Sequence, residues 1–405
     1  MTGESNAANT DLERFRVEAR AWLAAHFPTS LKGKGALMTA EIPPTANRDF
    51  QAWKRAMGEK GWGVPTWPTT LGGGGLGPAD AKVLGEEMRA VGAWSPIGGM
   101  GVMMFGPTLL EYGDEAQKAR HIPPIAKGEA RWCQGFSEPG AGSDLAALQT
   151  RCEDKGDHWL VNGQKVWTSG ANHADWCFCL VRTDPTRKHE GISFLLIDMR
   201  AAGVEVRPIR LISGNSPFCE TFFTDVKVAK ENLVGPLGGG WSIAKRLLQH
   251  ERNGIGGGRA GDGAGASLAV MAKDYVGESA GGKVADADLR MRIAAHEMDA
   301  RAFQLTALRS MAQARSNQAA GAVSSIMKNA GTKIAQDRLE LTVEIMGTQG
   351  LGWQGEGFTP GERAAVRAWL GSKAYTIYGG SAEIQNNIIA KRILGLPDPL
   401  GAASR

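Results

Sequence analysis

Residues 131–183 read RWCQGFSEPGAGSDLAALQTRCEDKGDHWLVNGQKVWTSGANHADWCFCLVRT, and the rest of the chain is organised around them. Residues 136–144 are rich in glycine and other turn-forming residues, which lets backbone N–H groups come close to a ligand. Strand-forming residues flank the pair Asn162-Gly163, which is typical of a two-residue hairpin turn. The sequence therefore predicts a ligand-binding loop followed by a hairpin that ends at Trp167-Thr168-Ser169.

The hydrophobic pattern on either side of this stretch changes period twice. Before residue 131, helical spacing predicts helices at 10–27, 47–61, from 79, at 98–112 and at 115–127. A period of two then predicts strands at 175–182, 191–199, 203–209 and 220–228. From Gly240 almost to Leu394 helical spacing returns, with glycine breaks near 277, at 347–357 and at 379–380. The expected order is helices, sheet, helices.

The composition excludes several classes of protein. The 405 residues carry a formal net charge of +4 without a block of lysine and arginine, so nucleic acid is not an expected partner. The chain shows neither an apolar run of the ~20 residues that cross a bilayer nor a signal peptide, so no membrane association is expected. Five cysteines without framework spacing indicate a cytoplasmic location. Cys177 and Cys179 are expected in the core rather than as metal ligands.

Residues 137–144, SEPGAGSD, followed by Trp167-Thr168-Ser169, resemble the signature of the acyl-CoA dehydrogenase family. Residues 377–385, IYGGSAEIQ, are similar to that family's Ile-Tyr-Glu-Gly-Thr-x-x-Ile-Gln, and the resemblance extends from about Leu12 to Pro397. It implies an α+β fold with an N-terminal α-helical bundle at 1–130 and a middle antiparallel β domain at 131–236. A C-terminal four-helix bundle at 237–405 would supply an oligomer interface.

The resemblance also implies FAD-dependent oxidation of an acyl-CoA thioester. A base removes a proton from the α carbon, a hydride leaves the β carbon for N5 of FAD, and an electron-transfer flavoprotein reoxidises the flavin. Carried over residue by residue, the positions that would contact the cofactor are Gln134, Phe136, Ser137, Gly142, Ser143, Trp167, Thr168, Ser169, Ser381 and Glu383.

The catalytic base departs from the family's commonest pattern. Most members hold it at the position of Gly379, which has no side chain to accept a proton. A minority, isovaleryl-CoA dehydrogenase among them, places the base on the helix after the β domain, and residues 248–252, LQHER, resemble that context. We therefore expect Glu251 as the base and the Gly379 N–H as donor to the thioester oxygen. The substrate would contact Ser143, Gly380 and Arg252. The alternative interpretation of Glu251 and Arg252 is a solvated ion pair on the surface of a helix.

A glycine-rich run at 253–266 follows the expected base. A flexible turn or close helix packing explains it, because each glycine lowers helix stability by roughly 1 kcal/mol relative to alanine. Alternatively, the missing side chains leave space for a bulky acyl group. That alternative predicts a preference for branched, cyclic or steroid-like thioesters.

The adenine half of the cofactor site also departs from the pattern. In homotetrameric members, a neighbouring subunit binds this half through Arg-x-x-Phe-Gly and Gln-x-x-Gly-Gly-x-Gly. Residues 275–279 lack the Arg and the Phe, Glu344 replaces the Gln, and Thr348 replaces a Gly. An acid beside a pyrophosphate is unfavourable. Similarity to bacterial heteromeric members implies an α2β2 heterotetramer with a second acyl-CoA dehydrogenase-like chain, the alternative being a homo-oligomer.

Two other functions remain open at this point. Flavin monooxygenases and nitroalkane oxidases share the fold, but they tend to lack the α-proton base or to use an Asp, so Glu251 argues against them. A non-catalytic partner subunit would explain Gly379 and the altered adenine half. It would not explain the flavin loop together with Glu251.

Overall fold

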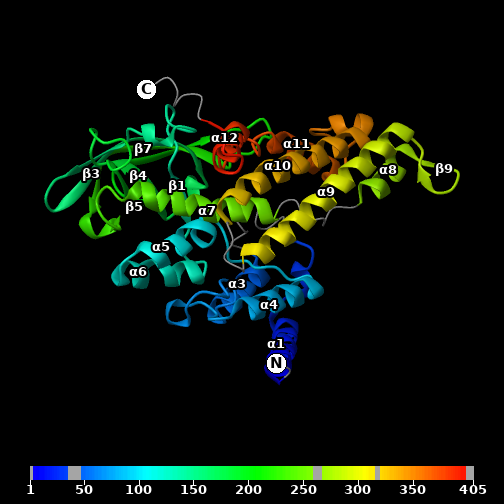
Figure 1. Ribbon diagram of the computed structural model, residues 1–405, viewed down its shortest axis with the longest axis horizontal. Coiled ribbons are helices and arrows are strands. Elements are labelled where there is room, and N and C mark those ends of the chain that lie inside the picture. Colours follow the sequence, from blue (N-terminus) through cyan, green and yellow to red (C-terminus); the bar gives the residue numbers. More distant parts are fainter. Residues whose placement is uncertain (1–2, 35–46, 259–266, 315–319, 398–405) are drawn as a thin grey trace. The chain divides into compact units, whose positions relative to one another are not determined.

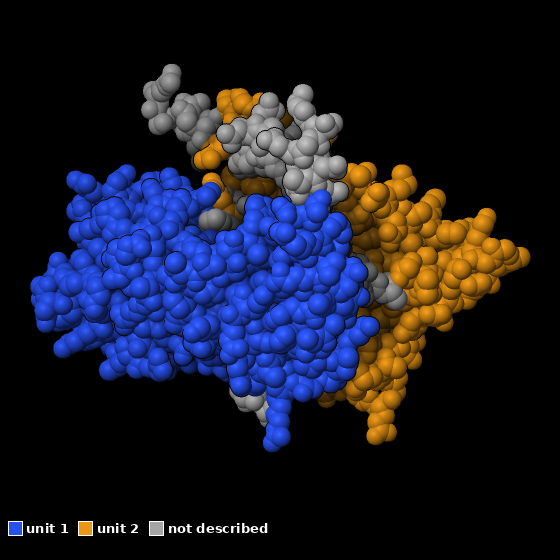
Figure 2. Space-filling view, turned by 90° about the horizontal axis from the view of Figure 1, so that it is seen from below, with its two compact units in different colours: residues 1–209, 217–247 blue, residues 210–216, 248–405 orange. Residues whose placement is uncertain are grey.

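The computed structural model describes the backbone of residues 3–34, 47–258, 267–314 and 320–397, and the side chains of 10–34, 47–249, 267–310 and 323–397. The chain forms two compact units, which Figure 2 colours separately. Unit 1 comprises residues 1–209 and 217–247, and unit 2 comprises residues 210–216 and 248–405. The expected order of helices, sheet and helices is confirmed. Because unit 1 contains both the first helices and the sheet, the domain boundaries at 130 and 236 stay predictions.

Local capping fixes the starts of two helices in unit 1. The Asn47 side chain accepts the Phe50 N–H at 2.9 Å, and Asp114 forms a reciprocal capping box with Gln117. A π-turn precedes α5, so the single helix expected at 98–112 is irregular. The elements are α1 (Gly3–His26), η1 (Thr29–Leu31), α3 (Arg48–Glu59), η2 (Thr69–Leu71), α4 (Pro78–Val91), η3 (Gly101–Phe105), α5 (Gly106–Tyr112) and α6 (Glu115–Ala126).

An aromatic core and an ion-pair cluster hold these helices together. Phe50 and Trp53 of α3 pack with the buried Trp62 in one hydrophobic cluster. Arg16 and Arg20 of α1 donate to the buried Glu87 carboxylate of α4 at 2.9 and 2.8 Å. The hydrogen bonds from Arg20 and Arg16 hold the pKa of Glu87 below its usual value. The cluster therefore fastens α1 to α4 with ionised groups.

The strands of unit 1 form one sheet, several strands of which Figure 1 labels. Their order is β6-β7-β3-β2-β4-β5-β8, with β1 paired to β4. Because β1 and β2 both run parallel to β4, the sheet is mixed, whereas the sequence predicted an antiparallel one. Each strand expected between 175 and 228 is present. The bounds are β1 (Trp132–Gly135), β2 (Arg151–Asp154), β3 (His158–Ser169), β4 (Trp176–Arg182), β5 (Ile192–Asp198), β6 (Val204–Ile209), β7 (Phe218–Ala229) and β8 (Leu233–Val234), with short helical turns η4 (Leu145–Ala147), η5 (Ala171–His173) and η6 (Lys230–Asn232).

The predicted hairpin turn at Asn162-Gly163 is wrong. β3 runs through both residues and pairs with β7 along its length, with a register shift between Val161 and Gly163. The Asn162 side chain accepts the backbone N–H of Asp225 in β7 at 2.8 Å, so it stabilises strand pairing instead of a turn. The hairpin connection lies earlier, between β2 and β3, where Gly156 has a φ of +91°.

The helices of unit 1 pack directly onto its sheet. Phe105 of η3 stacks on Trp132 of β1 and on Phe178 of β4, with ring centroids 3.9 and 5.4 Å apart. The Gln117 amide of α6 donates to the carbonyls of Glu231 in η6 and Leu233 in β8, each at 2.8 Å. Cys177 and Cys179 are fully buried in the sheet core, which confirms their expected structural role.

Unit 2 contains the helices that follow residue 248 in the sequence. α9 and α10 are its two longest helices and pack side by side (Figure 1). A small hairpin of β9 and β10, which the sequence analysis missed, follows α8. None of the described helices combines the length and the apolar character needed to cross a membrane. The elements are α7 (Gly240–Gly258), which begins in unit 1, α8 (Leu268–Val276), β9 (Glu278–Ser279), β10 (Lys283–Val284), α9 (Ala287–Ala314), α10 (Ala320–Ile345), η7 (Gly347–Leu351), α11 (Pro360–Ser372) and α12 (Ala382–Arg392).

Candidate active site

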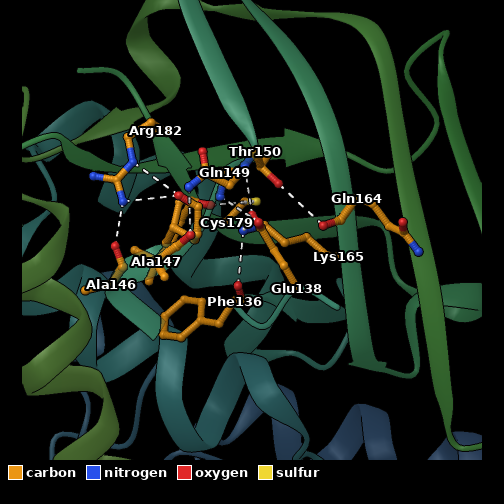
Figure 3. Close-up of polar contacts among 12 residues, drawn as sticks. Phe136, Glu138, Ala146, Ala147, Gln149, Thr150, Gln164, Lys165, Cys179 and Arg182 are labelled. Atoms are coloured by element: carbon orange, nitrogen blue, oxygen red, sulfur yellow. Dashed lines mark hydrogen bonds and ion pairs between the residues drawn. The ribbon is translucent and has the colours of Figure 1, made fainter. Parts of the chain in front are cut away.

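A buried carboxylate shapes the loop at 136–144. Glu138 accepts the backbone N–H groups of Gln149 and Thr150 at 2.6 and 2.8 Å (Figure 3). Its third partner is the Lys165 ammonium of β3, at 2.8 Å. One carboxylate therefore ties the start of the loop to the segment that follows it and to the neighbouring strand.

Lys165 completes this anchor from a fully buried position. Its ammonium group also donates to the Phe136 carbonyl at 3.1 Å (Figure 3). Burial alone would raise the pKa of Glu138, but the charge of Lys165 and the hydrogen bonds from Lys165, Thr150 and Gln149 hold that pKa below its usual value. Glu138 is thus an ionised structural group and is not free to exchange protons with a substrate. Lys165 was not among the residues predicted from the sequence, in which its only signal is a lysine inside a strand-forming run.

The inner side of the loop is packed and its outer side is open. Phe136 packs edge-on against Phe178 and Phe194, and the Ser137 carbonyl accepts the Val166 N–H at 2.9 Å. A Cβ atom added at Gly142 would meet nothing within 4 Å, and the adjacent Ser143 is exposed. The open side therefore presents backbone and small polar groups to a ligand.

The end of β3 turns a tryptophan outward. Trp167 has a φ of +60°, lies in a register shift between Lys165 and Thr168, and is 56% exposed. Such a bulge redirects a side chain from the sheet surface. The hydroxyl of the next residue, Thr168, is buried and has no hydrogen-bond partner among the described residues. An exposed aromatic ring, which packs edge-on against Phe218, and a hydroxyl without a described partner thus lie one residue apart.

Arg182 of β4 links two loop segments, residues 146–148 and residues 187–188. Its guanidinium donates to the carbonyls of Ala146 and Leu148 at 2.6 and 3.1 Å (Figure 3). It also donates to the carbonyls of Arg187 and Lys188, each at 2.8 Å. Desolvation lowers the pKa of this arginine, which remains charged. Arg182 is a second anchor that the sequence analysis missed.

In unit 2 the pair Gly379-Gly380 forms a tight turn before α12. Both residues are left-handed, with φ of +66° and +90°, a conformation that glycine adopts without strain. Ser381 caps α12 by accepting the Ile384 N–H at 3.4 Å. Glu383 is exposed, and its pKa is lowered by its own backbone N–H and by the Ser381 hydroxyl.

Comparison with known proteins places this geometry in a family. The sequence matches the models described as acyl-CoA dehydrogenase, N-terminal domain at residues 10–129, middle domain at 133–226 and C-terminal domain at 238–394. It is 35% identical over 402 residues to acyl-CoA dehydrogenase IpdE1 of Mycobacterium tuberculosis, covering 96% of this chain and 98% of that relative. The chain belongs to the acyl-CoA dehydrogenase family.

Solved structures agree with this assignment. This acyl-CoA dehydrogenase is similar to the Tcur3481-Tcur3483 steroid ACAD, with 28% identity, a TM-score of 0.77, and coverage of 96% of this chain and 98% of that one. It is also similar to a chain of the ChsE4-ChsE5 complex from Mycobacterium tuberculosis, with 29% identity, a TM-score of 0.73, and coverage of 96% and 98%. The predicted family, fold and class of enzyme are confirmed.

The structure brings several predicted cofactor residues of this acyl-CoA dehydrogenase together within unit 1. Gln134 lies in β1, Phe136 to Ser143 continue from it, and Trp167 to Ser169 end β3, whose residue Val166 bonds Ser137. Gly379, Gly380, Ser381 and Glu383 lie in and after one turn of unit 2. Glu251 and Arg252 belong to α7, but their side chains lie outside the described residues. The roles assigned to all these residues stay predictions.

Two substituted positions in the predicted adenine-binding segments have partners of their own. The Glu344 carboxylate on α10 accepts both guanidinium N–H groups of Arg292 on α9, one of them at 2.6 Å. Tyr275 donates to Glu362 at 2.8 Å. The charge of Glu344 is thus offset by Arg292, and the electrostatic argument against a nearby pyrophosphate must include that arginine. The residues 259–266 of the glycine-rich run lie outside the described part of the chain.

Proposed function

We propose that this chain catalyses FAD-dependent α,β-desaturation of an acyl-CoA thioester. The observation that carries the proposal is the junction of loop 136–144 with the end of β3, where Ser137 bonds Val166 beside an outward-facing Trp167. Family membership supplies the reaction class, and the open loop supplies a surface for a planar cofactor. The electrons would pass to an electron-transfer flavoprotein.

The residues at this junction fit a flavin. A buried Thr168 hydroxyl without a described partner can bond a ring atom, and burying such a group unsatisfied is unfavourable. The exposed Trp167 ring offers a flat apolar face, and an unhindered Gly142 allows close backbone approach. FAD bound here, by Gln134, Phe136, Ser137, Gly142, Ser143, Trp167, Thr168 and Ser169, would supply the hydride acceptor. Ser381 and Glu383 are further cofactor contacts that the family resemblance implies.

The protein's own groups would manage the proton and the carbonyl charge. The Glu251 carboxylate accepts the proton from the α carbon, and the Gly379 N–H donates to the thioester oxygen as negative charge grows there. A donor fixed in advance stabilises that charge without reorganisation at the moment of reaction. Ser143, Gly380 and Arg252 would orient the substrate. This division of roles explains how a site with glycine at position 379 retains a base.

The glycine-rich run after Glu251 supports a bulky acyl substrate. Residues 253–258 continue helix α7 although four of the six are glycine, which is unfavourable in a helix interior. The similarity to a steroid ACAD favours the same substrate class. We therefore expect faster oxidation of branched, cyclic or steroid-like thioesters than of short straight-chain ones.

An unpaired apolar face supports assembly with another chain. On α9, Met291, Met298, Leu305 and Leu308 are 67%, 73%, 50% and 61% exposed, although the opposite face buries Ile293 and Phe303. A helix that is apolar on both sides needs a second covering partner. The chain resembles a member of the ChsE4-ChsE5 complex, so an α2β2 heterotetramer is the proposed assembly, with a homo-oligomer as the alternative.

Anaerobic bleaching of the bound flavin by a thioester panel tests the function. The protein is purified with the partner chain that gives full FAD occupancy, as wild type and as Glu251→Gln. Loss of the base should slow bleaching by about 10²–10⁴-fold while flavin binding is unchanged. Glu356→Gln, a change at an exposed glutamate of the same unit, is the matched control and should behave as wild type.

Other outcomes separate the alternatives. If the flavin of Glu251→Gln is bleached at the wild-type rate, another group is the base. Rapid oxygen consumption by the reduced protein would favour an oxidase or monooxygenase. A fully assembled complex in which this chain's flavin never bleaches would favour a non-catalytic subunit.

A further inference from the structure

A buried lysine lies behind the Gly379-Gly380 turn. Lys328 of α10 is 0% exposed, and its ammonium group donates to the Gly380 carbonyl at 2.6 Å. Lysine is among the residues least often found fully buried, because removing an ammonium group from water is costly. The position therefore calls for a role that a neutral or apolar side chain would not fill.

A second side chain holds the same turn. The Gln385 amide, 1% exposed on α12, donates to the Gly379 carbonyl at 3.0 Å and approaches the Gly380 carbonyl at 3.4 Å. A Cβ atom on Gly380 would lie only 2.5 Å from that amide nitrogen, so the contact requires glycine. Both carbonyls of the double glycine are thus bonded to buried donors from two different helices.

These anchors restrict the most flexible dipeptide that a chain can contain. Two consecutive glycines leave four backbone dihedrals with little steric restriction, and ordering them lowers conformational entropy substantially. In a trans peptide the carbonyl and the N–H of one unit point in opposite directions. Fixing the carbonyls of Gly379 and Gly380 therefore fixes the planes of the two peptides that follow Gly379. The Gly379 N–H belongs to the preceding peptide, and on that side the Tyr378 N–H donates to the Ala374 carbonyl at 3.1 Å. The turn is thus held on both sides of the Gly379 N–H.

We propose that Lys328 is a positioning residue for the substrate carbonyl, because it holds the Gly379-Gly380 turn in the conformation that presents the Gly379 N–H to the thioester oxygen. The inference rests on the proposed function, in which that N–H receives the oxygen. Lys328 itself touches neither substrate nor cofactor in this scheme. An ammonium group suits the role since a charged donor binds a carbonyl more strongly than a neutral one.

The test compares two ligands that differ only at the carbonyl. Cyclohexanecarbonyl-CoA is a thioester, and S-(cyclohexylmethyl)-CoA is its thioether counterpart with CH₂ in place of C=O. Because the thioester would itself reduce the flavin, the comparison is made in the Glu251→Gln background, with unchanged Lys328 as the wild-type reference. Affinities of both ligands are measured there by anaerobic titration of the flavin absorbance of the assembled, FAD-loaded protein. A purely structural defect would weaken both ligands together. Loss of carbonyl positioning would weaken the thioester alone, so the ratio of the two dissociation constants is the readout.

We expect wild type to bind the thioester about tenfold more tightly than the thioether, as one hydrogen bond implies, and Lys328→Met to bring the ratio close to one. Lys328→Arg, which keeps a charged donor, should restore part of the ratio. Lys333→Met, at an exposed lysine of the same helix, should keep the wild-type ratio. Lys328→Gln, whose side chain ends one bond short, carries the same test if Lys328→Met does not fold.

The outcomes distinguish this inference from the function on which it rests. A wild-type ratio in folded Lys328→Met or Lys328→Gln would overturn the positioning role and leave the dehydrogenase function intact. Equal binding of both ligands by wild type would remove the carbonyl-binding role of Gly379 and, with it, the role of Lys328. Flavin bleaching by wild type, measured separately, reports whether the desaturation itself occurs.

Discussion

The buried pair of Glu138 and Lys165 holds the shape of the loop at 136–144. Glu138 receives three hydrogen bonds, and Lys165 supplies the only charge among their donors. Removing one partner of a buried pair leaves a charge without compensation, which is more damaging than replacing both. The geometry of the loop therefore depends on two residues that make no predicted contact with cofactor or substrate.

Lys165→Met should lower the free energy of unfolding by about 3–5 kcal/mol, because it leaves the Glu138 carboxylate buried and unpaired. FAD retention should fall as well, since the loop loses one of its links to β3 and keeps only the bond between Val166 and Ser137. Urea unfolding and flavin absorbance measure the two effects. The double variant of Lys165→Met and Glu138→Gln should lose less free energy of unfolding than the sum of the losses in the single variants. Lys155→Met, at an exposed lysine paired with Glu153, should change stability by less than about 0.5 kcal/mol.

At single positions, the predictions from the sequence agree with the structure where a motif names the residue. They differ from it where two residues distant in the sequence are in contact. The loop motif named Ser137, Gly142 and Ser143, and the structure leaves Gly142 and Ser143 accessible at its open face. The motif could not predict the ion pair between Glu138 and Lys165. The turn expected at Asn162-Gly163 would have placed Lys165 on a returning strand of unknown register. A one-residue change of register moves a side chain to the opposite face of a sheet.

Among the secondary-structure elements, periodicity located the helices and strands, and side-chain bonding decided the exceptions. Strands predicted at 175–182 and 191–199 are β4 and β5 within one residue at each end. The pair Asn162-Gly163 has the composition of a turn, but Asn162 bonds Asp225 and keeps β3 extended. Turn propensity is local, whereas the partner that overrides it lies about sixty residues away, so the sequence alone does not reveal it.

The attachment of α1 to α4 supplies a prediction for stability against pH. Glu87→Gln should lower the free energy of unfolding at pH 7 by about 1–3 kcal/mol, because Arg16 and Arg20 lose a charged acceptor. The folded-state pKa of Glu87 is lowered, so its contribution is complete above the unfolded value of about 4.3 and is lost as the pH falls through the folded value.

Urea unfolding of wild type and Glu87→Gln at several pH values measures that contribution. The difference between them should be largest near pH 7 and should shrink as the pH falls below about 4.3. Glu86→Gln is the matched control, because Glu86 is more exposed and makes its shortest ion pair with Arg16 at 3.0 Å. A difference independent of pH would indicate that the carboxylate charge of Glu87 contributes nothing.

For the molecule as a whole, the sequence indicated the order of helices, sheet and helices but not which surfaces stay uncovered. The substitutions at residues 275–279, Glu344 and Thr348 suggested a site divided between chains. The structure adds that Arg292 offsets the charge of Glu344 and that α9 carries a second apolar face. An exposed stripe cannot be recognised from periodicity alone, because a helix with apolar residues on two faces looks like a buried one.

The exposed apolar face of α9, a stripe made of Met291, Met298, Leu305 and Leu308, gives the last prediction. Met298 and Leu305 are seven residues apart, two helical turns, so they face the same direction. Burial of each of these side chains at an interface should contribute about 1.5–3 kcal/mol to the free energy of association. Met298→Lys with Leu305→Lys should therefore weaken assembly at least a hundredfold and yield smaller, FAD-depleted particles in light scattering. Val17→Lys, at an equally exposed residue of α1, should leave the particle mass unchanged. A double variant that keeps both its mass and its flavin would place the partner elsewhere, because no interface that buries this stripe could accommodate two unpaired ammonium groups.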